Sequence, residues 1–220
     1  MSTAIHHRHG SHVAAPASGS SSLRDPPYGD APPYAPPKDA VGTQVGQDRR
    51  MRWTGGGEQV DFFLDTEFID LDRAIELISL GLVAADGREF YAISTEFDDS
   101  GANDFVRSSV LPLLEPLDHP AWMSRAEMKD ALVSFVGSVV PRFWAWGGAP
   151  YDWLAMAQLF PVERVPDGWR YTAYDVSLLV ELAGIPLESV DTRFPAHSGD
   201  GHHALADARW LRDVFRTLAI

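Results

Sequence analysis

Two acidic residues, Asp65 and Glu67, interrupt an otherwise apolar stretch that runs from Val60 to Ile69. A continuous apolar run of this length is typical of a strand that is buried on both faces. Because side chains alternate across a strand, acids at positions i and i+2 project from the same face, while Thr66 points away. Any fold of this chain must therefore place two neighbouring carboxylates on one face of an interior strand.

The charges of Asp65 and Glu67 repel each other and raise each other's pKa unless a cation lies between them. Oxygen ligands from Asp and Glu suit a hard divalent cation such as Mg²⁺ or Mn²⁺. The alternative interpretation is a strand that ends at Leu64 and leaves both acids solvated in a loop. Because the pattern Asp-x-Glu is common, the motif alone favours this alternative.

Two further acids belong to expected helices. Asp152 follows Pro150, which favours a first helical position, so it lies in the first turn of a helix that runs toward Phe160. A carboxylate there is also explained by the helix dipole alone. Asp207 lies in a final helix that opens near Gly201, and it borders an apolar stripe made by Ala204, Ala208, Leu211, Phe215 and Leu218. A solvated surface acid is the alternative, but an acid beside a buried face usually needs a partner.

Together the four acids, in the order Asp-x-Glu, Asp and His-x4-Asp, make the chain resemble the DEDDh 3′–5′ exonucleases of the ribonuclease-H-like superfamily. Within them it is most similar to the bacterial polyadenylate-specific 3′-exoribonucleases, in the segments Phe63–Ile69, Glu76–Val83 and Trp144–Gly147. The resemblance covers roughly Val60 to Ile220. The middle motif departs from the commoner pattern, in which an Asn precedes an aromatic residue and the Asp.

This resemblance implies hydrolysis of the terminal phosphodiester bonds of single-stranded RNA from the 3′ end, with release of nucleoside 5′-monophosphates. Two Mg²⁺ ions, for which Mn²⁺ could substitute, would lie about 4 Å apart. Asp65 would bridge both ions, and Glu67 and Asp207 would complete the site on the side of the nucleophile. Asp152 would hold the ion on the side of the leaving group. Several relatives form dimers, so the resemblance also implies a homodimer.

A histidine would accept the proton of the attacking water, a role that suits its ordinary pKa. Helical spacing favours His203, because it precedes Asp207 by four residues. The family pattern places the histidine five residues before the aspartate and selects His202, which the neighbouring Gly199 and Gly201 place in a loop before the helix. We choose His202 on this pattern. His197 is a weaker candidate and is interpreted as a loop residue.

The residues indicate the reaction more clearly than they indicate the substrate. Phe68 and Tyr151 are candidates for stacking on bases, although aromatic residues beside apolar strands are more often part of the core. The preference for RNA rests on the resemblance alone, and a DNA-directed or short-oligonucleotide 3′–5′ exonuclease is the alternative. A catalytically silent nucleic-acid-binding module is a further alternative, against which the retention of all four acids and the histidine argues.

Composition suggests a tail followed by one domain. Residues 1–57 are rich in Pro, Gly and Ser and are expected to be disordered, because they cannot bury enough surface to offset their ordering entropy. Residues 58–220 form the expected exonuclease domain. The formal net charge of −13 argues against a protein that grips long nucleic acids, but not against one that holds a few terminal nucleotides. The chain has no cysteine, signal sequence or membrane-spanning stretch, which fits a cytoplasmic protein.

The order of the expected elements predicts an α/β fold, in which a mixed sheet is flanked by helices as in ribonuclease H. An Asp86-Gly87 pair predicts a hairpin, and Ser124 with Glu127 predicts a capping box at a helix start. The expected strands are Val60–Asp65, Ile75–Ala85, Glu89–Thr95, Phe143–Trp146 and a short one near Tyr171. The expected helices begin near Ser124, at Pro150, at Asp175, which is interpreted as a helix-start residue, and near Gly201.

Overall fold

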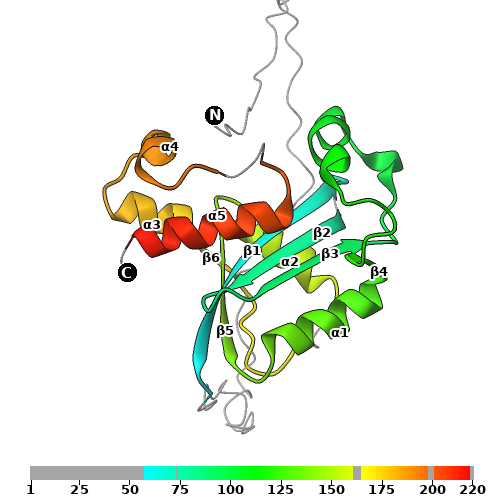
Figure 1. Ribbon diagram of the computed structural model, residues 1–220, viewed down its shortest axis with the longest axis horizontal. Helices are drawn as coiled ribbons and strands as arrows, with labels where there is room; N and C mark the ends of the chain where they lie inside the picture. The colour runs from blue at the N-terminus through cyan, green and yellow to red at the C-terminus, as the bar shows by residue number, and fades with distance from the viewer. Residues whose placement is uncertain (1–56, 73, 161–164, 198–200, 219–220) are drawn as a thin grey trace, which may run out of the picture. The chain divides into compact units, whose positions relative to one another are not determined.

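The computed structural model describes residues 57–72, 74–160, 165–197 and 201–218. The expected tail, residues 1–57, lies outside the described residues except for Gly57. Six strands form one sheet in the order β4-β3-β2-β1-β5-β6 (Figure 1). The strands are β1 (Gln59–Asp70), β2 (Ile75–Ala84), β3 (Glu89–Ser94), β4 (Trp122–Met123), β5 (Val140–Ala145) and β6 (Tyr174–Asp175). The α-helices are α1 (Arg125–Val136), α2 (Ala149–Ala157), α3 (Val176–Leu182), α4 (Val190–Arg193) and α5 (Ala204–Thr217).

The sheet is mixed, which confirms the expected α/β fold class. Strand β2 pairs antiparallel with β1 and β3, whereas β5 pairs parallel with β1 and β6, and β4 pairs parallel with β3. The predicted hairpin joins β2 to β3. Gly87 adopts a φ of 94° in its turn, a conformation that glycine reaches without a steric clash, and its N–H donates to the carbonyl of Ala84 at 2.9 Å.

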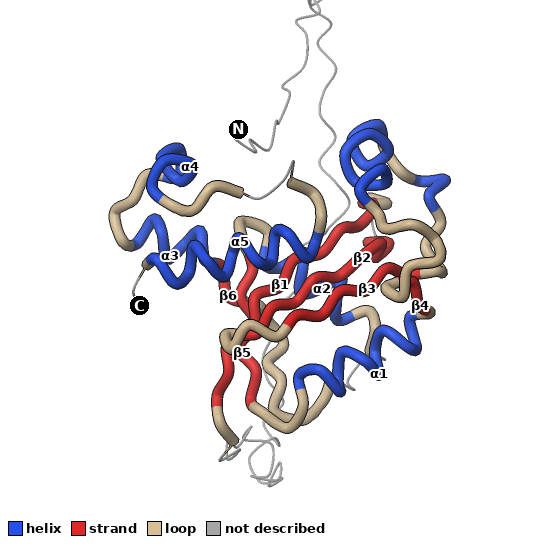
Figure 2. The backbone as a smooth tube through the Cα atoms, viewed as in Figure 1, coloured by secondary structure: helices blue, strands red, loops and turns tan. Residues whose placement is uncertain are grey.

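Helices cover both faces of the sheet (Figure 2). Alternate residues of β1 enter different cores, as the period of two requires. Phe62 and Leu64 pack in the cluster that contains buried residues of α1 and α2. Phe63 packs in the cluster that contains buried residues of α3 and α5. The odd-numbered residues of this part of β1, which include Asp65, therefore face α5.

Strand β1 is longer than the expected Val60–Asp65, because it continues to Asp70. Glu67 therefore lies within the strand and is 8% exposed, so the alternative of a strand that ends at Leu64 is wrong. A register shift between Glu67 and Phe68 follows the second acid. Smaller differences affect β5, which begins at Val140 rather than Phe143, and β6, which lies at Tyr174 rather than near Tyr171. In each case pairing with neighbouring strands, which the local pattern does not specify, decides the boundary.

The predicted helix starts are confirmed with small shifts. Ser124 and Glu127 form a reciprocal capping box at the start of α1, with Ser124 N donating to Glu127 Oε2 at 2.8 Å. Asp152 lies in the first turn of α2, and Asp175 is the N-cap of α3. The final helix begins at Ala204 rather than near Gly201, because Gly201 and His202 both have left-handed backbone conformations.

Residues between β3 and α1 form a segment that the sequence pattern did not predict. It contains three short helical segments, η2 (Asp99–Gly101), η3 (Val106–Val110) and η4 (Leu111–Leu113), and a fourth, η5 (Leu187–Ser189), precedes α4. Val106 and Val110 pack against Ile69 and Ile78, so this segment covers the far end of β1. Within the part of the chain that the structure describes, no helix has the length and apolar character needed to cross a bilayer.

Candidate metal centre

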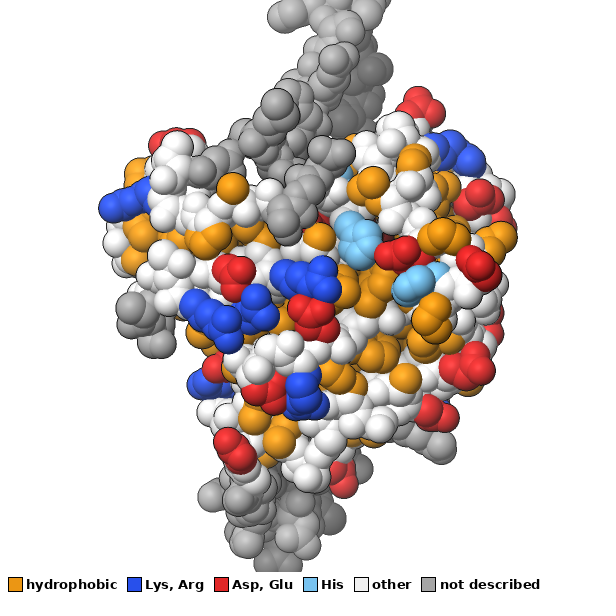
Figure 3. All heavy atoms as spheres, viewed as in Figure 1, with side chains coloured by type: hydrophobic (Ala, Val, Ile, Leu, Met, Phe, Trp, Pro, Cys, Tyr) orange, Lys and Arg blue, Asp and Glu red, His pale blue; other side chains and the backbone are white. Residues whose placement is uncertain are grey.

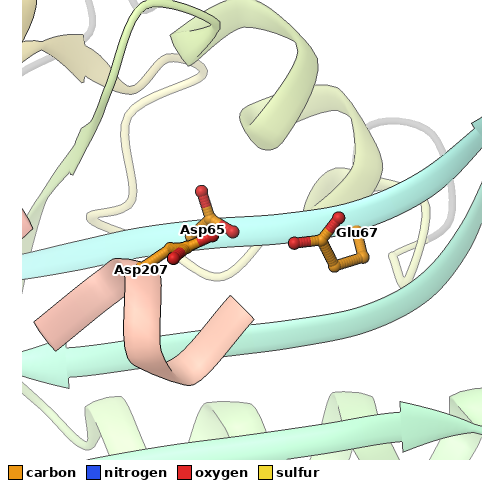
Figure 4. A group of neighbouring side chains, drawn as sticks. All are labelled: Asp65, Glu67 and Asp207. Carbon is orange, nitrogen blue, oxygen red and sulfur yellow. The ribbon is translucent and has the colours of Figure 1, made fainter. Parts of the chain in front are cut away.

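Three of the four predicted acids meet on the α5 face of the sheet. Asp65 and Glu67 project from β1, and Asp207 projects from the first turn of α5 (Figure 4). Each offers a carboxylate oxygen, and these three atoms all lie within 4.8 Å of one another. The two acids of the strand and the acid of the last helix, which are about 140 residues apart in the sequence, therefore form one cluster.

The approach of α5 depends on Gly81. This residue pairs with Asp65 across the β1–β2 ladder. A Cβ atom at position 81 would lie 2.3 Å from the backbone carbon and oxygen of Ala204, the first residue of α5. Only a glycine therefore lets the start of α5 lie directly on β2, and this contact brings Asp207 to the acids of β1.

Two local interactions define the start of α5. His203 is the N-cap, and its Nδ1 accepts a long hydrogen bond of 3.4 Å from the N–H of Ala206. Asp207 Oδ2 accepts a hydrogen bond of 2.9 Å from the backbone N–H of His202. His202 adopts a φ of 64°, which is uncommon for a residue other than glycine. The loop before α5 is thus held to Asp207 in a strained backbone conformation.

Burial and mutual repulsion make the acids of β1 weak acids. The pKa of Asp65 lies well above its ordinary value, first because burial disfavours the charge and then because Asp152, Glu67 and Asp207 are close. Burial, followed by repulsion from Asp207 and Asp152, raises the pKa of Glu67 to about 8. These shifts indicate a site that lacks positive charge.

A divalent cation would fit this site chemically. Among the described residues, no Lys or Arg forms an ion pair with Asp65, Glu67, Asp152 or Asp207. The ligand atoms are all carboxylate oxygens, which hard cations such as Mg²⁺ and Mn²⁺ prefer. A bound cation would favour the ionised form of each acid and so relieve the repulsion that, together with burial, raises the pKa values of Asp65 and Glu67.

The fourth acid, Asp152, lies nearby but is oriented by a different residue. Its Oδ1 accepts hydrogen bonds from the Thr66 N–H at 3.0 Å and from the Thr66 hydroxyl at 2.8 Å. Asp152 is 6% exposed, and burial raises its pKa to about 7 although the Thr66 bonds oppose this shift. It is close enough to raise the pKa of Asp65, but it does not belong to the three-acid cluster.

Three histidines surround Asp207 in different ways. His202 contacts it through its backbone N–H, and the His202 ring lies edge-on to Phe105 with the centroids 4.7 Å apart. His203 is the N-cap of α5, with an extended rather than a helical backbone, and its ring stacks on Tyr91. His197 lies in a loop, as expected, but its Nε2 contacts Asp207 Oδ1 directly.

The two aromatic candidates lie close to each other. The rings of Phe68 and Tyr151 are nearly parallel, with an interplanar angle of 11° and centroids 6.1 Å apart. Tyr151 is 56% exposed, whereas Phe68 is partly buried and packs against the core. Tyr151 therefore has a ring surface available to a ligand, and the Phe68 ring lies nearly parallel to it.

Three residues contribute to the site in ways that sequence reasoning missed. Thr66 was expected only to point away from the acids, yet it holds Asp152. Gly81 admits α5, and His197 reaches Asp207. The position of Thr66 between the two acids was a local signal. The roles of Gly81 and His197 had no such signal, because their partners are distant in the sequence.

Comparisons with known proteins point to one family. Residues 60–219 match the model of the family described as the 3′–5′ exoribonuclease Rv2179c-like domain. The chain is also similar to two proteins of Mycobacterium tuberculosis, 3′–5′ exoribonuclease MT2234.1 of strain CDC 1551 and 3′–5′ exoribonuclease Rv2179c of strain H37Rv. Each is 42% identical over 161 residues, which cover 71% of this chain and 92% of the relative.

Proposed function

Because this chain belongs to the family of Rv2179c-like 3′–5′ exoribonuclease domains, we propose that it is a metal-dependent 3′–5′ exoribonuclease of the DEDDh type. It removes nucleotides from the 3′ ends of single-stranded RNA and releases nucleoside 5′-monophosphates. The observation that carries this proposal is the cluster of three carboxylates from β1 and α5. A cluster of acids that pairs with no Lys or Arg among the described residues is unfavourable for the fold and therefore calls for a function.

The chain's own acids would hold the cations. Divalent cations at this site would stabilise the negative charge that develops during phosphodiester hydrolysis. Asp65, Glu67 and Asp207 would bind one Mg²⁺ or Mn²⁺ through the oxygens that already lie together. Asp152, whose orientation Thr66 fixes, would take part in holding a second ion.

His202 would accept the proton of the attacking water. Its spacing from Asp207 matches the family pattern, and the loop that carries it is tied to Asp207 through its own N–H. The φ of 64° at His202 supports this role, because strained backbone conformations concentrate at functional sites. His197 is the competing candidate, since its ring already contacts Asp207.

The surface favours recognition of a short RNA end. The exposed Tyr151 ring, backed by Phe68, can stack on a base, an interaction worth about 1–3 kcal/mol per base. Basic side chains on the face in Figure 3 lie among acidic ones and form no continuous basic surface. Arg209, for example, makes a bidentate ion pair with Glu89 at 2.8 and 2.5 Å. Arg209 is therefore held by Glu89 and not free to bind phosphates far from the 3′ end.

This function predicts stepwise shortening of RNA that requires a divalent cation. Purified protein with Mg²⁺ or Mn²⁺ should shorten a 5′-labelled RNA oligomer in steps of one nucleotide, because only the terminal bond enters the site. EDTA should abolish the reaction, since the acids alone cannot stabilise the developing charge. Gel electrophoresis resolves the steps, and chromatography identifies the nucleoside 5′-monophosphates.

A DNA oligomer of the same sequence and an RNA with a blocked 3′ end serve as controls. If the DNA is degraded faster than the RNA, then DNA rather than RNA is the preferred substrate. Release of internal fragments, or full activity in EDTA, would exclude the proposed mechanism.

Substitution of the three histidines separates their roles. His202→Ala should slow hydrolysis by about 10²–10⁴-fold, the usual scale of a lost general base, without weakening the binding of Mn²⁺. His203→Ala should leave the rate nearly unchanged but lower the stability by about 1 kcal/mol, because it removes the N-cap of α5. Single-turnover rates, calorimetric titration with Mn²⁺ and urea unfolding measure these three effects.

The variant His197→Ala serves as the comparison, since it removes the other ring near Asp207. If His197→Ala is the slow variant and His202→Ala keeps the wild-type rate, then His197 is the base. If His203→Ala is the slow one, the helix spacing rather than the family pattern identified the right residue.

A further inference from the structure

Two hydroxyl groups share the sheet face of the candidate metal ligands. Ser79 pairs with Glu67 across the β1–β2 ladder, and Tyr91 pairs with Gly81, which in turn pairs with Asp65. Residues directly opposite each other in antiparallel strands project from the same face, as do residues two apart on one strand. The side chains of Ser79 and Tyr91 therefore extend the row of acids from β1 toward β3, beneath the start of α5.

Both hydroxyls are buried and unpartnered among the described residues. Ser79 is 0% exposed, and neither its Oγ nor the phenolic oxygen of Tyr91 has a hydrogen-bond partner of normal geometry. The two groups are nevertheless neighbours: burial raises the pKa of Tyr91, the Ser79 hydroxyl opposes this shift, and the negative charges of Glu115 and then of Glu67 add to it. Glu67 is thus within electrostatic reach of the Tyr91 hydroxyl.

The fold itself does not explain these hydroxyls. A buried polar group without a partner destabilises a protein by about 1–3 kcal/mol, so Ala at position 79 and Phe at position 91 would pack with less penalty. The Tyr91 ring has its own support, because it stacks on His203 with centroids 4.7 Å apart, and this contact needs no hydroxyl. A second state of the protein in which the hydroxyls find a partner would account for them.

We propose that Ser79 and Tyr91 are positioning residues for Glu67 in the cation-bound protein. In that state their hydroxyls donate hydrogen bonds, in series or separately, to the ionised Glu67 carboxylate and hold it toward the cation. The inference rests on the metal-dependent function proposed above. Carboxylates that bind metals are commonly fixed by such outer hydrogen bonds, whose loss weakens metal binding by about 10–100-fold.

The test compares Tyr91→Phe and Ser79→Ala with the wild-type full chain, using Mn²⁺ as the probe. Calorimetric titration should give a Kd for Mn²⁺ that rises by about 10–100-fold in each variant. Thermal unfolding in EDTA should give a Tm equal to or above that of the wild type, because each variant removes an unpartnered buried hydroxyl. Removal of a hydroxyl with a merely structural role would instead lower the Tm and leave the Kd for Mn²⁺ unchanged.

Ser94→Ala is the matched control. Ser94 is also 0% exposed, but its Oγ accepts a hydrogen bond of 3.1 Å from the N–H of Glu96, and it projects from the face of β3 opposite to that of Tyr91. This variant should lower the Tm and leave the Kd for Mn²⁺ unchanged. Wild-type Mn²⁺ affinity in both Tyr91→Phe and Ser79→Ala would overturn the inference and leave the proposed function intact. Failure of the wild-type protein to bind Mn²⁺ would overturn both.

Discussion

Replacement of Asp65 by Asn is expected to abolish cation binding and to slow RNA hydrolysis by at least about 10³-fold. Asp65 lies at the centre of the site: Glu67, Asp207 and Asp152 all raise its pKa. An amide of the same shape keeps the packing but removes the charge that the cations need. Loss of about 4 kcal/mol of charge stabilisation in the transition state corresponds to this factor.

The same variant should be more stable than the wild type at high pH when no metal is present. The folded pKa values of Asp65 and Glu67 lie above their unfolded values, and that of Glu67 reaches about 8. The folded state therefore keeps protons that the unfolded state releases, so wild-type stability falls as the pH rises from about 4.5 toward 8. Asp65→Asn removes one of these acids and its repulsion of the others, so its stability should fall less.

Thermal unfolding in EDTA at pH 6 and pH 8, together with calorimetric titration and single-turnover hydrolysis, measures these effects. Asp70→Asn is the matched control, because Asp70 is an exposed acid at the end of the same strand. It should leave Mn²⁺ affinity and the rate unchanged. If Asp65→Asn keeps a rate above about one tenth of the wild type, then the charge of Asp65 is not essential for hydrolysis.

Gly81→Ala should both destabilise the fold and inactivate the enzyme, although residue 81 makes no contact with a substrate in the proposed mechanism. The added Cβ would lie 2.3 Å from backbone atoms of Ala204 and 2.4 Å from the N atom of Leu205, so α5 must move. Overpacking of this kind lowers the stability by about 1–3 kcal/mol. The loss should be near the upper value, because the clashing atoms belong to the backbone and cannot rotate away. Asp207 moves with α5, and a displacement near 1 Å can slow catalysis by about 10²-fold.

The stability measured by urea unfolding, the Mn²⁺ affinity and the hydrolysis rate of Gly81→Ala should therefore all be lower than those of the wild type. Gly57→Ala is the control, because a Cβ at residue 57 would meet the Val140 side chain at 3.4 Å and the backbone of Ser138 and Val140 at 3.7 and 3.9 Å, all ordinary contact distances. A Gly81→Ala protein with wild-type metal affinity would mean that α5 can tilt away at Ala204 without carrying Asp207 out of the cluster.

Features encoded by neighbouring residues were predictable from the sequence. Alternation along β1 placed Asp65 and Glu67 on one face, and the Asp86-Gly87 pair correctly marked the β2–β3 hairpin. The capping box of α1 and the position of Asp152 in the first turn of α2 were also correct. Each of these depends on backbone preferences and hydrogen bonds that span only a few residues.

Distances between remote parts of the chain were decided by the tertiary structure. The sequence grouped four acids, whereas the structure brings three together and ties Asp152 to Thr66. It also shows His203 as a helix cap and His197 in contact with Asp207. These outcomes depend on the register of β1 against β2 and on how closely α5 can approach Gly81. The β1–β2 register joins neighbouring strands, but the approach of α5 to Gly81 is set by packing between segments more than a hundred residues apart, which no local pattern specifies.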